Sequence, residues 1–499
     1  MVIRDLKSLK QFFKEHVKTP IFGVGVYAFD RLGPEDFVKN YRLLALRHSG
    51  DTKLIERDVE TLSLEKGMGT KHITYARNST TVIAHPKIKE YLNKFDRPAL
   101  IVYKSSSKME RICRENGWTL IVPPFKFGKK LFEDKIKFRK ILDELGASPT
   151  PGEVIAVKNL NFYELKTKYG LPFVIQHPRR GGGKGTFFIH SEDEWHKAIR
   201  RLHIKEVEGE EVSEDITNLE VIAAKYIQGP SPSITGCVTR HGILYTNPQY
   251  QLIDIQELYN PKKGAGLFCG HDWSASNFSR EITRQIYDIT EKVGNHFAAF
   301  GYKGIFGLDF VLDEDNEKVY VTESNPRLLA SFPAITMTQL RNNEPPIIAF
   351  HILEYLDIDY KIDKDSIQRL MQQKKEGAQM FPHNLTGHWA ISHGKVRPGI
   401  YKMVNGEPRF VRSGYAMKHL KRKREFLLTD GVLQKGAHYS PNRRLGRILT
   451  LRRVLSKDKK TLTPRAKKFV LRLHDDFKLK RVWFVKIRKF FNPNFLVKG

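Results

Sequence analysis

The chain has 499 residues, which exceeds what a single hydrophobic core usually serves, so we expect several domains. Its composition, 40% hydrophobic and 28% charged, is typical of a folded protein, and no apolar run approaches the roughly 18 residues of a membrane span. The net charge is +30, which excludes an acidic, self-solvating chain and makes its distribution informative.

Three widely spaced cysteines without a CxxC pair exclude a zinc ribbon or a disulfide framework. With no long apolar run, we expect no transmembrane segment. The first residues are charged where a signal peptide would be apolar, and scarce cysteine fits a reducing compartment, so we expect a cytoplasmic location. The positive charge is concentrated at the end of the chain. Residues 361–499 hold 35 Lys and Arg against 9 Asp and Glu, whereas residues 1–360 hold 50 and 46. This change predicts a boundary near Tyr360.

Residues 1–120 alternate short apolar runs with helical patterns, which predicts an α/β domain with a mainly parallel sheet. The strands are expected near 19–27, 43–46, 99–103 and 119–122, with a helix over 108–116. Gly23 and Gly25 lack the third glycine of a dinucleotide-binding fingerprint, so this strand is given no function.

Residues 121–360 begin with a predicted helix at 132–145 and continue with a strand, a glycine-rich loop and a second strand. Such a loop can direct backbone N–H groups at an anion, although a glycine-rich turn between strands is more often only a turn. A strand follows instead of a helix, so the loop is not a P-loop. Its candidate phosphate-binding residues are Gly181, Gly182, Gly183, Lys184 and Gly185.

Two further strands, 304–312 and 318–327, are joined by an acidic turn that predicts a hairpin. Pairing across the turn brings Asp309 close to Glu323, and strand alternation places Asn325 on the same face as Glu323. Facing carboxylates repel unless a cation lies between them, and a few hard oxygen ligands suit Mg²⁺. For a hairpin alone, a water-facing polar surface is the commoner explanation.

Together and in this order, the two motifs resemble the ATP-grasp superfamily of carboxylate–amine ligases and biotin carboxylase-like enzymes, over roughly residues 135–360. The resemblance implies an α/β and α+β protein: an N-terminal pre-ATP-grasp α/β domain at 1–120, a two-subdomain ATP-grasp fold at 121–360 and a basic C-terminal module at 361–499. It also implies that ATP and Mg²⁺ are bound, with Mn²⁺ as the alternative metal. The matching positions are Lys135, Gln176, the five loop residues and the hinge residues Lys225, Tyr226 and Ile227 for the nucleotide, and Asp309, Glu323 and Asn325 for the metal.

This sequence departs from the family pattern twice. Gln176 stands where a lysine usually contacts the nucleotide, and Ala224 stands where an acidic residue often precedes the hinge. Arg179 or Arg180 could supply the missing charge, or nucleotide affinity could be low. The complete set of metal ligands argues against a decayed site.

The implied reaction is ATP-dependent ligation, in which a small-molecule carboxylate becomes an acyl phosphate that an amine or other nucleophile attacks. Arg327 is the candidate catalytic residue that orients the acyl phosphate or the substrate carboxylate, and a structural salt bridge is nearly as good an explanation. His271 could contact substrate, although a lone loop histidine is more often exposed.

The basic region 361–499 predicts a small β-rich or α+β module followed by a helical pattern from Pro464 with Phe469, Leu473 and Phe477 on one side. The helix either covers the core with a solvated cationic face or binds a polyanionic partner. The alternative to a ligase is therefore a non-catalytic or regulatory ATP-binding protein whose basic C-terminus binds nucleic acid or an anionic membrane.

Overall fold

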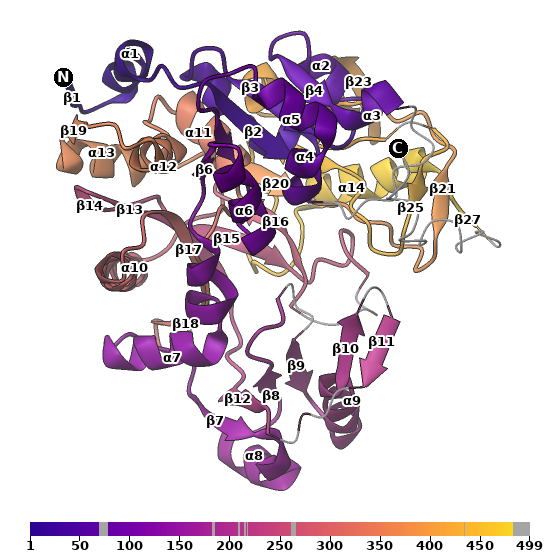
Figure 1. Cartoon of the computed structure of the whole chain (residues 1–499). Helices are drawn as coiled ribbons and strands as arrows, with labels where there is room; N and C mark the ends of the chain where they lie inside the picture. Colours follow the sequence, from indigo (N-terminus) through magenta and orange to yellow (C-terminus); the bar gives the residue numbers. More distant parts are fainter. Residues whose placement is uncertain are drawn as a thin grey trace.

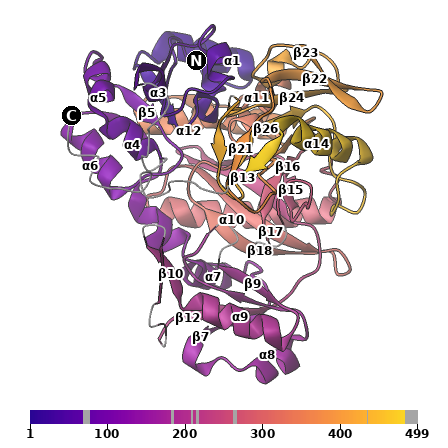
Figure 2. The same cartoon turned by 90° about the vertical axis from the view of Figure 1, so that its right-hand side faces the viewer.

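The computed structural model describes residues 1–68, 78–181, 185–207, 210–213, 216, 218–260, 266–433 and 435–482. A parallel sheet with its helices lies at the top of Figure 1, a small antiparallel sheet with two helices lies at the bottom, and a large sheet lies between them. The quarter-turn view of Figure 2 keeps the small lobe at the bottom and brings the C-terminal strands beside the parallel sheet.

The N-terminal sheet has the strand order β4-β3-β2-β5-β6, and all of its pairs are parallel, as the alternating pattern predicted. Its central strands β2 and β5 contain only apolar residues and glycine, because helices cover the sheet. The elements are β2 (Ile21–Gly25), β3 (Arg42–Ala45), β4 (Thr61–Ser63), β5 (Ala99–Ile101), β6 (Thr119–Ile121), α4 (Ser79–Ala84), α5 (Pro86–Leu92) and α6 (Ser107–Glu115).

The small lobe is an antiparallel sheet of order β7-β12-β8-β9 with two helices packed on it through Phe162, Trp195 and Leu202. Ser191 caps the second helix by accepting a hydrogen bond from the backbone of Glu194. The elements are β7 (Gly152–Ala156), β8 (Phe173–Gln176), β9 (Thr186–Ile189), β12 (Glu220–Lys225), α8 (Phe162–Tyr169) and α9 (Glu192–Leu202).

The large sheet follows the order β18-β17-β13-β15-β16-β20-β26-β24-β22-β23, and β14 pairs with β13. Its first strands carry the acidic hairpin, and its last strands come from the basic C-terminal region. The strands are β13 (Pro232–Thr239), β14 (Gly242–Tyr245), β15 (Gln249–Ile253), β16 (Phe268–Asp272), β17 (Gly304–Asp313), β18 (Lys318–Asn325), β20 (Ala378–Met380), β22 (Gly399–Val404), β23 (Glu407–Arg412), β24 (Glu425–Thr429) and β26 (Arg447–Thr450).

Helices pack on both ends of this sheet. The first end is covered by α10 (Arg280–Ala299), and the second by α14 (Pro464–Phe477), whose Phe469 stacks on Phe426 of β24 with ring centroids 4.1 Å apart. The C-terminal helix therefore covers the core, as one of its two explanations predicted. It ends at Phe477, and the aromatic residues from Trp483 onward lie outside the described residues.

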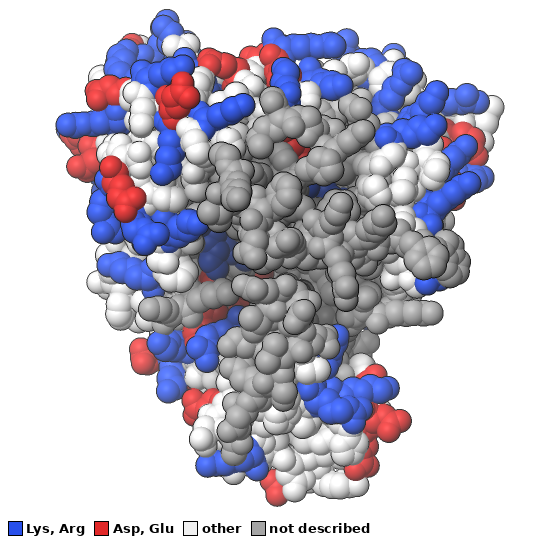
Figure 3. All heavy atoms as spheres, turned by 45° about the vertical axis from the view of Figure 1, so that its right-hand side comes forward, with Lys and Arg blue, Asp and Glu red and all other residues white. Residues whose placement is uncertain are grey.

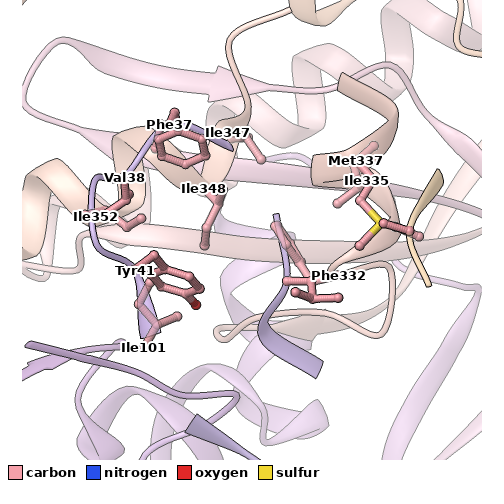
Figure 4. Close-up of a cluster of buried hydrophobic side chains, with 14 of the residues drawn as sticks. Phe37, Val38, Tyr41, Ile101, Phe332, Ile335, Met337, Ile347, Ile348 and Ile352 are labelled. Atoms are coloured by element: carbon pink, nitrogen blue, oxygen red, sulfur yellow. The ribbon is translucent and has the colours of Figure 1, made fainter. Parts of the chain in front are cut away.

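A continuous core joins the parallel sheet to the large sheet through α11 (Ala334–Arg341) and α12 (Ile347–Leu356). Figure 4 shows Ile348 and Ile352 of α12 among Phe37, Tyr41 and Ile101 of the N-terminal region. Burial of each such aliphatic side chain contributes about 1.5–3 kcal/mol to folding.

The remaining elements complete the surface. They are β1 (Val2–Ile3), α1 (Leu6–His16), α2 (Thr52–Ile55), α3 (Leu64–Met68), α7 (Lys135–Glu144), β10 (Ile204–Val207), β11 (Glu210–Ser213), β19 (Lys361–Ile362), α13 (Lys364–Met371), β21 (Ala390–Ser392), β25 (His438–Tyr439) and β27 (Leu479–Arg481). Among the described residues, no helix is long and apolar enough to cross a membrane.

Candidate functional site

The two candidate metal-binding carboxylates face each other across the β17–β18 hairpin. Asp309 and Glu323 are direct cross-strand partners, and Asn325 pairs with Gly307. The register shifts immediately after Asp309, so the regular ladder is interrupted where the acidic side chains meet. The hairpin and the proximity of its carboxylates therefore agree with the sequence prediction.

Amide side chains hold the Asp309 carboxylate in place. Asn325 Nδ2 donates to Oδ2 at 2.8 Å, and Gln251 Nε2 of β15 donates to Oδ1 at 2.9 Å. Withdrawal from water and the neighbouring Glu323 carboxylate raise the pKa of Asp309 to about 7, against the opposing effect of Arg327. A bound cation would offset the repulsion between Glu323 and this poorly hydrated carboxylate.

Arg327 lies between the acidic pair and the N-terminal region. Its Nη2 donates to Asn325 Oδ1, its Nη1 donates to the Tyr103 hydroxyl, and its Nε lies 3.3 Å from Glu133 Oε1. Burial alone would lower the pKa of Arg327, but Tyr103, Glu133 and the acidic pair raise it, so the guanidinium is firmly charged. The contact with Glu133 is the structural salt bridge that was one explanation of Arg327. Its expected role in orienting an acyl phosphate or a substrate carboxylate stays a prediction.

Lys135 opens α7, where Asp134 caps the first turn by accepting from the backbone of Ile136 and Lys137. The residue is only 6% exposed. Its Nζ lies 3.6 Å from Glu323 Oε2 and donates to the backbone carbonyl of Arg180 at 3.1 Å. Lys135 therefore connects the acidic pair to the start of the glycine-rich loop.

The glycine-rich loop begins and ends at the paired strands β8 and β9. Gln176 pairs with Thr186, its Nε2 donates to Thr186 Oγ1 at 3.3 Å, and His177 N donates to Gly185 O at 2.7 Å. A side chain at Gly185 would collide with Arg180 Cβ, so the base of the loop requires glycine there. Gly182, Gly183 and Lys184 lie outside the described residues, so their predicted contact with phosphate stays a prediction.

The backbone at the end of α9 holds the guanidinium of Arg180, one of the two arginines considered in place of the missing lysine. Its guanidinium donates at 2.7–3.0 Å to backbone carbonyls at the end of α9 and the start of β10, those of Arg201, Leu202 and Ile204. Cations at a helix C-terminus are favourable there, which gives Arg180 a structural function. Of the two arginines considered, Arg179 is the exposed one.

The expected hinge continues from β12, the strand that pairs with β8 beside Gln176. Lys225 is the last residue of β12, and Tyr226 and Ile227 follow it. The Tyr226 ring meets Phe188 of β9 edge-on with centroids 5.6 Å apart. The structure thus places the hinge residues next to the strands that carry the glycine-rich loop.

His271 differs from the expectation of an exposed loop residue. It lies in β16 between β15 and β20, is 4% exposed, and its Nδ1 lies 2.7 Å from Gln379 Nε2. Burial, with a smaller effect of Arg447, lowers the pKa of His271 to about 3, so the imidazole is neutral and accepts from Gln379. His271 is buried because β20, from the C-terminal region, pairs with β16. The local sequence does not indicate this pairing.

Three residues at the site were not singled out by their sequence: Glu133, Tyr103 and Gln251. Glu133 ion-pairs with both Arg327 and Lys104, and its position two residues before Lys135 was the only available signal. Tyr103 follows β5 and lies 224 residues before Arg327 in the chain. Such contacts depend on how the parallel sheet meets the large sheet.

Comparisons with known proteins agree with this geometry. Residues 132–331 match the family model described as the ATP-grasp domain. The carbamoyl phosphate synthase arginine-specific large chain of Geobacillus stearothermophilus is 22% identical over 431 residues, covering 84% of this chain and 36% of the relative. The biotin carboxylase of Haemophilus influenzae is 23% identical and covers 54% of this chain and 59% of the relative. The chain thus spans less than two thirds of each of these curated relatives.

Among solved structures, the biotin carboxylase complex from Campylobacter jejuni superposes with a TM-score of 0.55 at 14% identity and covers 96% of each chain. The carboxyaminoimidazole ribonucleotide synthase from Aspergillus clavatus, complexed with ATP, gives a TM-score of 0.51 at 13% identity, covering 92% of this chain and 98% of that one. At these identities the likeness establishes the fold, which agrees with the predicted α/β and α+β architecture.

Proposed function

Because residues 132–331 match the model of the ATP-grasp domain, we propose that the protein is an ATP-dependent ligase that activates a carboxylate as an acyl phosphate. The observation that carries this proposal is the cluster formed by Asp309, Asn325 and Glu323 between two cations, Lys135 and Arg327. It joins the start of the glycine-rich loop to a partly exposed acidic pair, which is where the charge of a transferred phosphoryl group would need to be stabilised.

The residues present fit a divalent cation. Asp309, Glu323 and Asn325 offer oxygen atoms, and withdrawal from water, together with the neighbouring Glu323 carboxylate, raises the pKa of Asp309, a cost that a bound cation would offset. Mg²⁺, or Mn²⁺ as the alternative, would neutralise phosphate charge when bound there. Asn325 and Gln251 hold the Asp309 carboxylate in one orientation for this purpose.

ATP would lie between the small lobe and the acidic hairpin. Gln176, Gly181 and Gly185, together with Gly182, Gly183 and Lys184, are proposed to enclose the phosphates, and Lys225, Tyr226 and Ile227 to border the adenine. The adjacency of β8, β9 and β12 in one sheet supports this assignment. The ammonium of Lys135, next to the base of the loop, would offset charge on the transferred phosphoryl group.

The proposed reaction has two steps. An oxygen of the substrate carboxylate attacks the γ-phosphorus, the bond to the bridging oxygen of ADP breaks, and ADP leaves with that electron pair. An amine or other nucleophile then attacks the carbonyl carbon, loses its proton and displaces inorganic phosphate. Arg327, charged and fixed by Tyr103 and Glu133, would orient the carboxylate and then the acyl phosphate.

The alternative, a non-catalytic ATP-binding protein with a polyanion-binding C-terminus, has weaker support. The helix α14 packs Phe469, Val470, Leu473 and Phe477 into the core. In Figure 3, Lys and Arg are spread around the described part of the face together with Asp and Glu. A polyanionic partner remains the less favoured proposal.

The test uses the full chain with ATP, Mg²⁺ and pools of small carboxylates, with hydroxylamine as the nucleophile. A ligase should release ADP only when its carboxylate is present and should convert that carboxylate to a hydroxamate, because hydroxylamine attacks the acyl phosphate. Lys135→Met should lose both signals. Carboxylate-independent ADP release, or none with any pool, would contradict the proposed reaction.

A further inference from the structure

A cavity of about 240 Å³ lies beside α11, in a part of the molecule that the proposed reaction does not use. Its walls come from four segments that are far apart in the chain: α1, residues 35–36, α11 and residues 416–418. None of its lining residues belongs to the acidic hairpin, the glycine-rich loop or the hinge. Drug-sized ligands occupy sites of about 300–1,000 Å³, so this cavity suits a smaller molecule.

The fold holds these four segments against one another. Thr338 Oγ1 of α11 lies 3.3 Å from Met417 Sδ, which joins α11 to the C-terminal segment. A side chain at Gly33 would collide with Thr336 of α11, so the turn before residues 35–36 packs directly on this helix. Leu9 of α1 belongs to the same hydrophobic core. The walls of the cavity are therefore set by the packing of the protein itself.

Acidic and basic side chains both line the cavity. Asp36 and Lys418 compensate each other, because Lys418 Nζ lies 2.9 Å from Asp36 Oδ1. The three other charged residues of the lining, Glu35, Lys10 and Arg341, form no ion pair within the part of the chain that the structure describes. The cavity thus presents one uncompensated negative group and two uncompensated positive groups.

Glu35 is the negative group. Its Oε2 accepts from the backbone N–H of Gly33, and no side chain in the described ranges donates to the carboxylate. Withdrawal from water and the neighbouring Asp36 raise the pKa of Glu35 to about 7, against weaker opposing effects that include Lys418. A cationic group in the cavity would offset this cost, and a partly exposed Glu35 is accessible to it.

Arg341 is the better placed of the two positive groups. Its Nη1 donates to the backbone carbonyl of Leu420 at 3.4 Å, which restrains the guanidinium while leaving it exposed. A restrained guanidinium binds a carboxylate through two parallel hydrogen bonds, a geometry that an ammonium cannot offer. Lys10 adds a second positive charge from α1.

The remaining lining is apolar. It consists of Met337 and Leu340 from α11 and Ala416 from the C-terminal segment. An aliphatic group of the ligand would remove these side chains from water, which contributes roughly 25 cal/mol for each Å² that is buried. The cavity therefore combines sites for a cation, an anion and a short apolar chain.

We propose that this cavity binds a free aliphatic α-amino acid, whose ammonium group pairs with Glu35, whose carboxylate pairs with Arg341, and whose side chain packs on Met337. A ligand with only one of the two charges would leave the other protein group uncompensated, so the site selects the zwitterion. This site is separate from the reaction centre, and the proposal does not depend on the ligase reaction.

The test measures binding to the full chain by calorimetry, with glycine, L-alanine, L-valine, L-leucine and L-methionine as probes. Two analogues of leucine each lack one charge: 3-methylbutylamine lacks the carboxylate, and 4-methylpentanoate lacks the ammonium group. Glu35→Gln and Arg341→Gln remove the two proposed partners, and glutamine at position 35 keeps an oxygen that can accept from Gly33. The matched controls are Glu15→Gln on α1 and Arg111→Gln on α6, because both residues are exposed and lie outside the cavity.

At least one of the aliphatic amino acids should bind the wild type, and both control variants should bind it with the same affinity. Glu35→Gln and Arg341→Gln should each lose roughly 10- to 100-fold, the worth of a charge-assisted hydrogen bond. Both leucine analogues should bind at least about 10-fold more weakly than leucine for the same reason. Lys135→Met should bind the amino acid normally, because Lys135 belongs to the nucleotide site.

Absence of binding by all five amino acids would overturn the proposal. Binding that survives in either Glu35→Gln or Arg341→Gln would also overturn it, as would equal affinity for leucine and one of its singly charged analogues, since the site would then not recognise a zwitterion. Loss of binding in Lys135→Met would place the amino acid in the reaction centre instead. Failure of the hydroxamate test with this binding intact would reject the ligase reaction and leave the amino-acid site standing.

Discussion

Replacement of Glu323 by glutamine removes one charge from the acidic pair while keeping the shape of the side chain. Two unit charges about 4 Å apart interact by roughly 4 kcal/mol at an effective dielectric constant near 20. The attraction between Glu323 and a divalent ion would be twice as large. Desolvation of the carboxylate and the loss of its 3.6 Å contact with Lys135 would reduce the net gain from binding the ion. We expect a net loss of about 3 kcal/mol, which is a ~100-fold weaker affinity for Mg²⁺.

The melting temperature of the protein with saturating ADP, measured as Mg²⁺ is added after chelation, reports this affinity. At a concentration 100 times the wild-type dissociation constant, Mg²⁺ should stabilise the wild type by about 2.7 kcal/mol and Glu323→Gln by about 0.4 kcal/mol. Glu314→Gln is the matched control, because Glu314 is an exposed carboxylate at the turn of the same hairpin.

Equal Mg²⁺-dependent stabilisation of Glu323→Gln and the wild type would refute the reasoning, since the cation would then be bound elsewhere. A similar loss in Glu314→Gln would refute it differently, by showing that the general charge of the hairpin matters instead of the paired carboxylates.

Three more predictions concern other parts of the molecule. The loop 179–186 should be cut by protease without nucleotide and protected by Mg-ATP, because closure over the phosphates would bury it; equal cleavage under both conditions would reject the loop assignment. Phe469→Ala should lower the free energy of unfolding by about 3–5 kcal/mol in urea titrations, since Phe469 is fully buried against Phe426. Binding of RNA or anionic vesicles by the folded wild type, with a steep loss of affinity as salt rises, would instead support the polyanion proposal. The Arg412 hydrogen bonds lower the pKa of Glu425 to about 2, so their stabilisation is complete above about pH 4.5 and is lost as pH falls toward 2. Arg412→Ala should therefore destabilise more at pH 7 than at pH 3 in denaturant titrations, and an equal effect at both would contradict this.

The sequence predicted the parts of the site that depend on local pattern. Asp309 and Glu323 were brought together because a short acidic turn joins two alternating strands, and such a turn leaves little freedom of register. Lys135 was assigned from the resemblance to the ATP-grasp superfamily, within a helix predicted over 132–145. The structure begins this helix at Lys135, after the cap at Asp134, and the role of Lys135 in nucleotide binding stays a prediction.

Contacts between distant segments could not be predicted in this way. The partners of Arg327 come from Glu133 and Tyr103, and the orientation of Asp309 depends on Gln251 of another strand. His271 is buried because β20 covers β16, and no periodicity within either strand specifies that pairing. The arrangement of sheets, set by the shared core, determines all of these contacts.

The division proposed near Tyr360 was inferred from charge, and it stays a proposal. The structure adds that β16 of the central region pairs with β20 of the basic region, with Gly270 opposite Met380. The change in charge therefore places a boundary near Tyr360, whereas backbone pairing joins the central and the basic regions in one sheet.

The β16–β20 pairing has a practical consequence for anyone who shortens the protein. A fragment ending near residue 360 would lack β20 and leave the backbone N–H and C=O groups of β16 along an open edge. Unprotected edges of this kind recruit strands from other molecules. Such a fragment is expected to accumulate as insoluble material, so expression for crystallography or screening should retain the strands through β26.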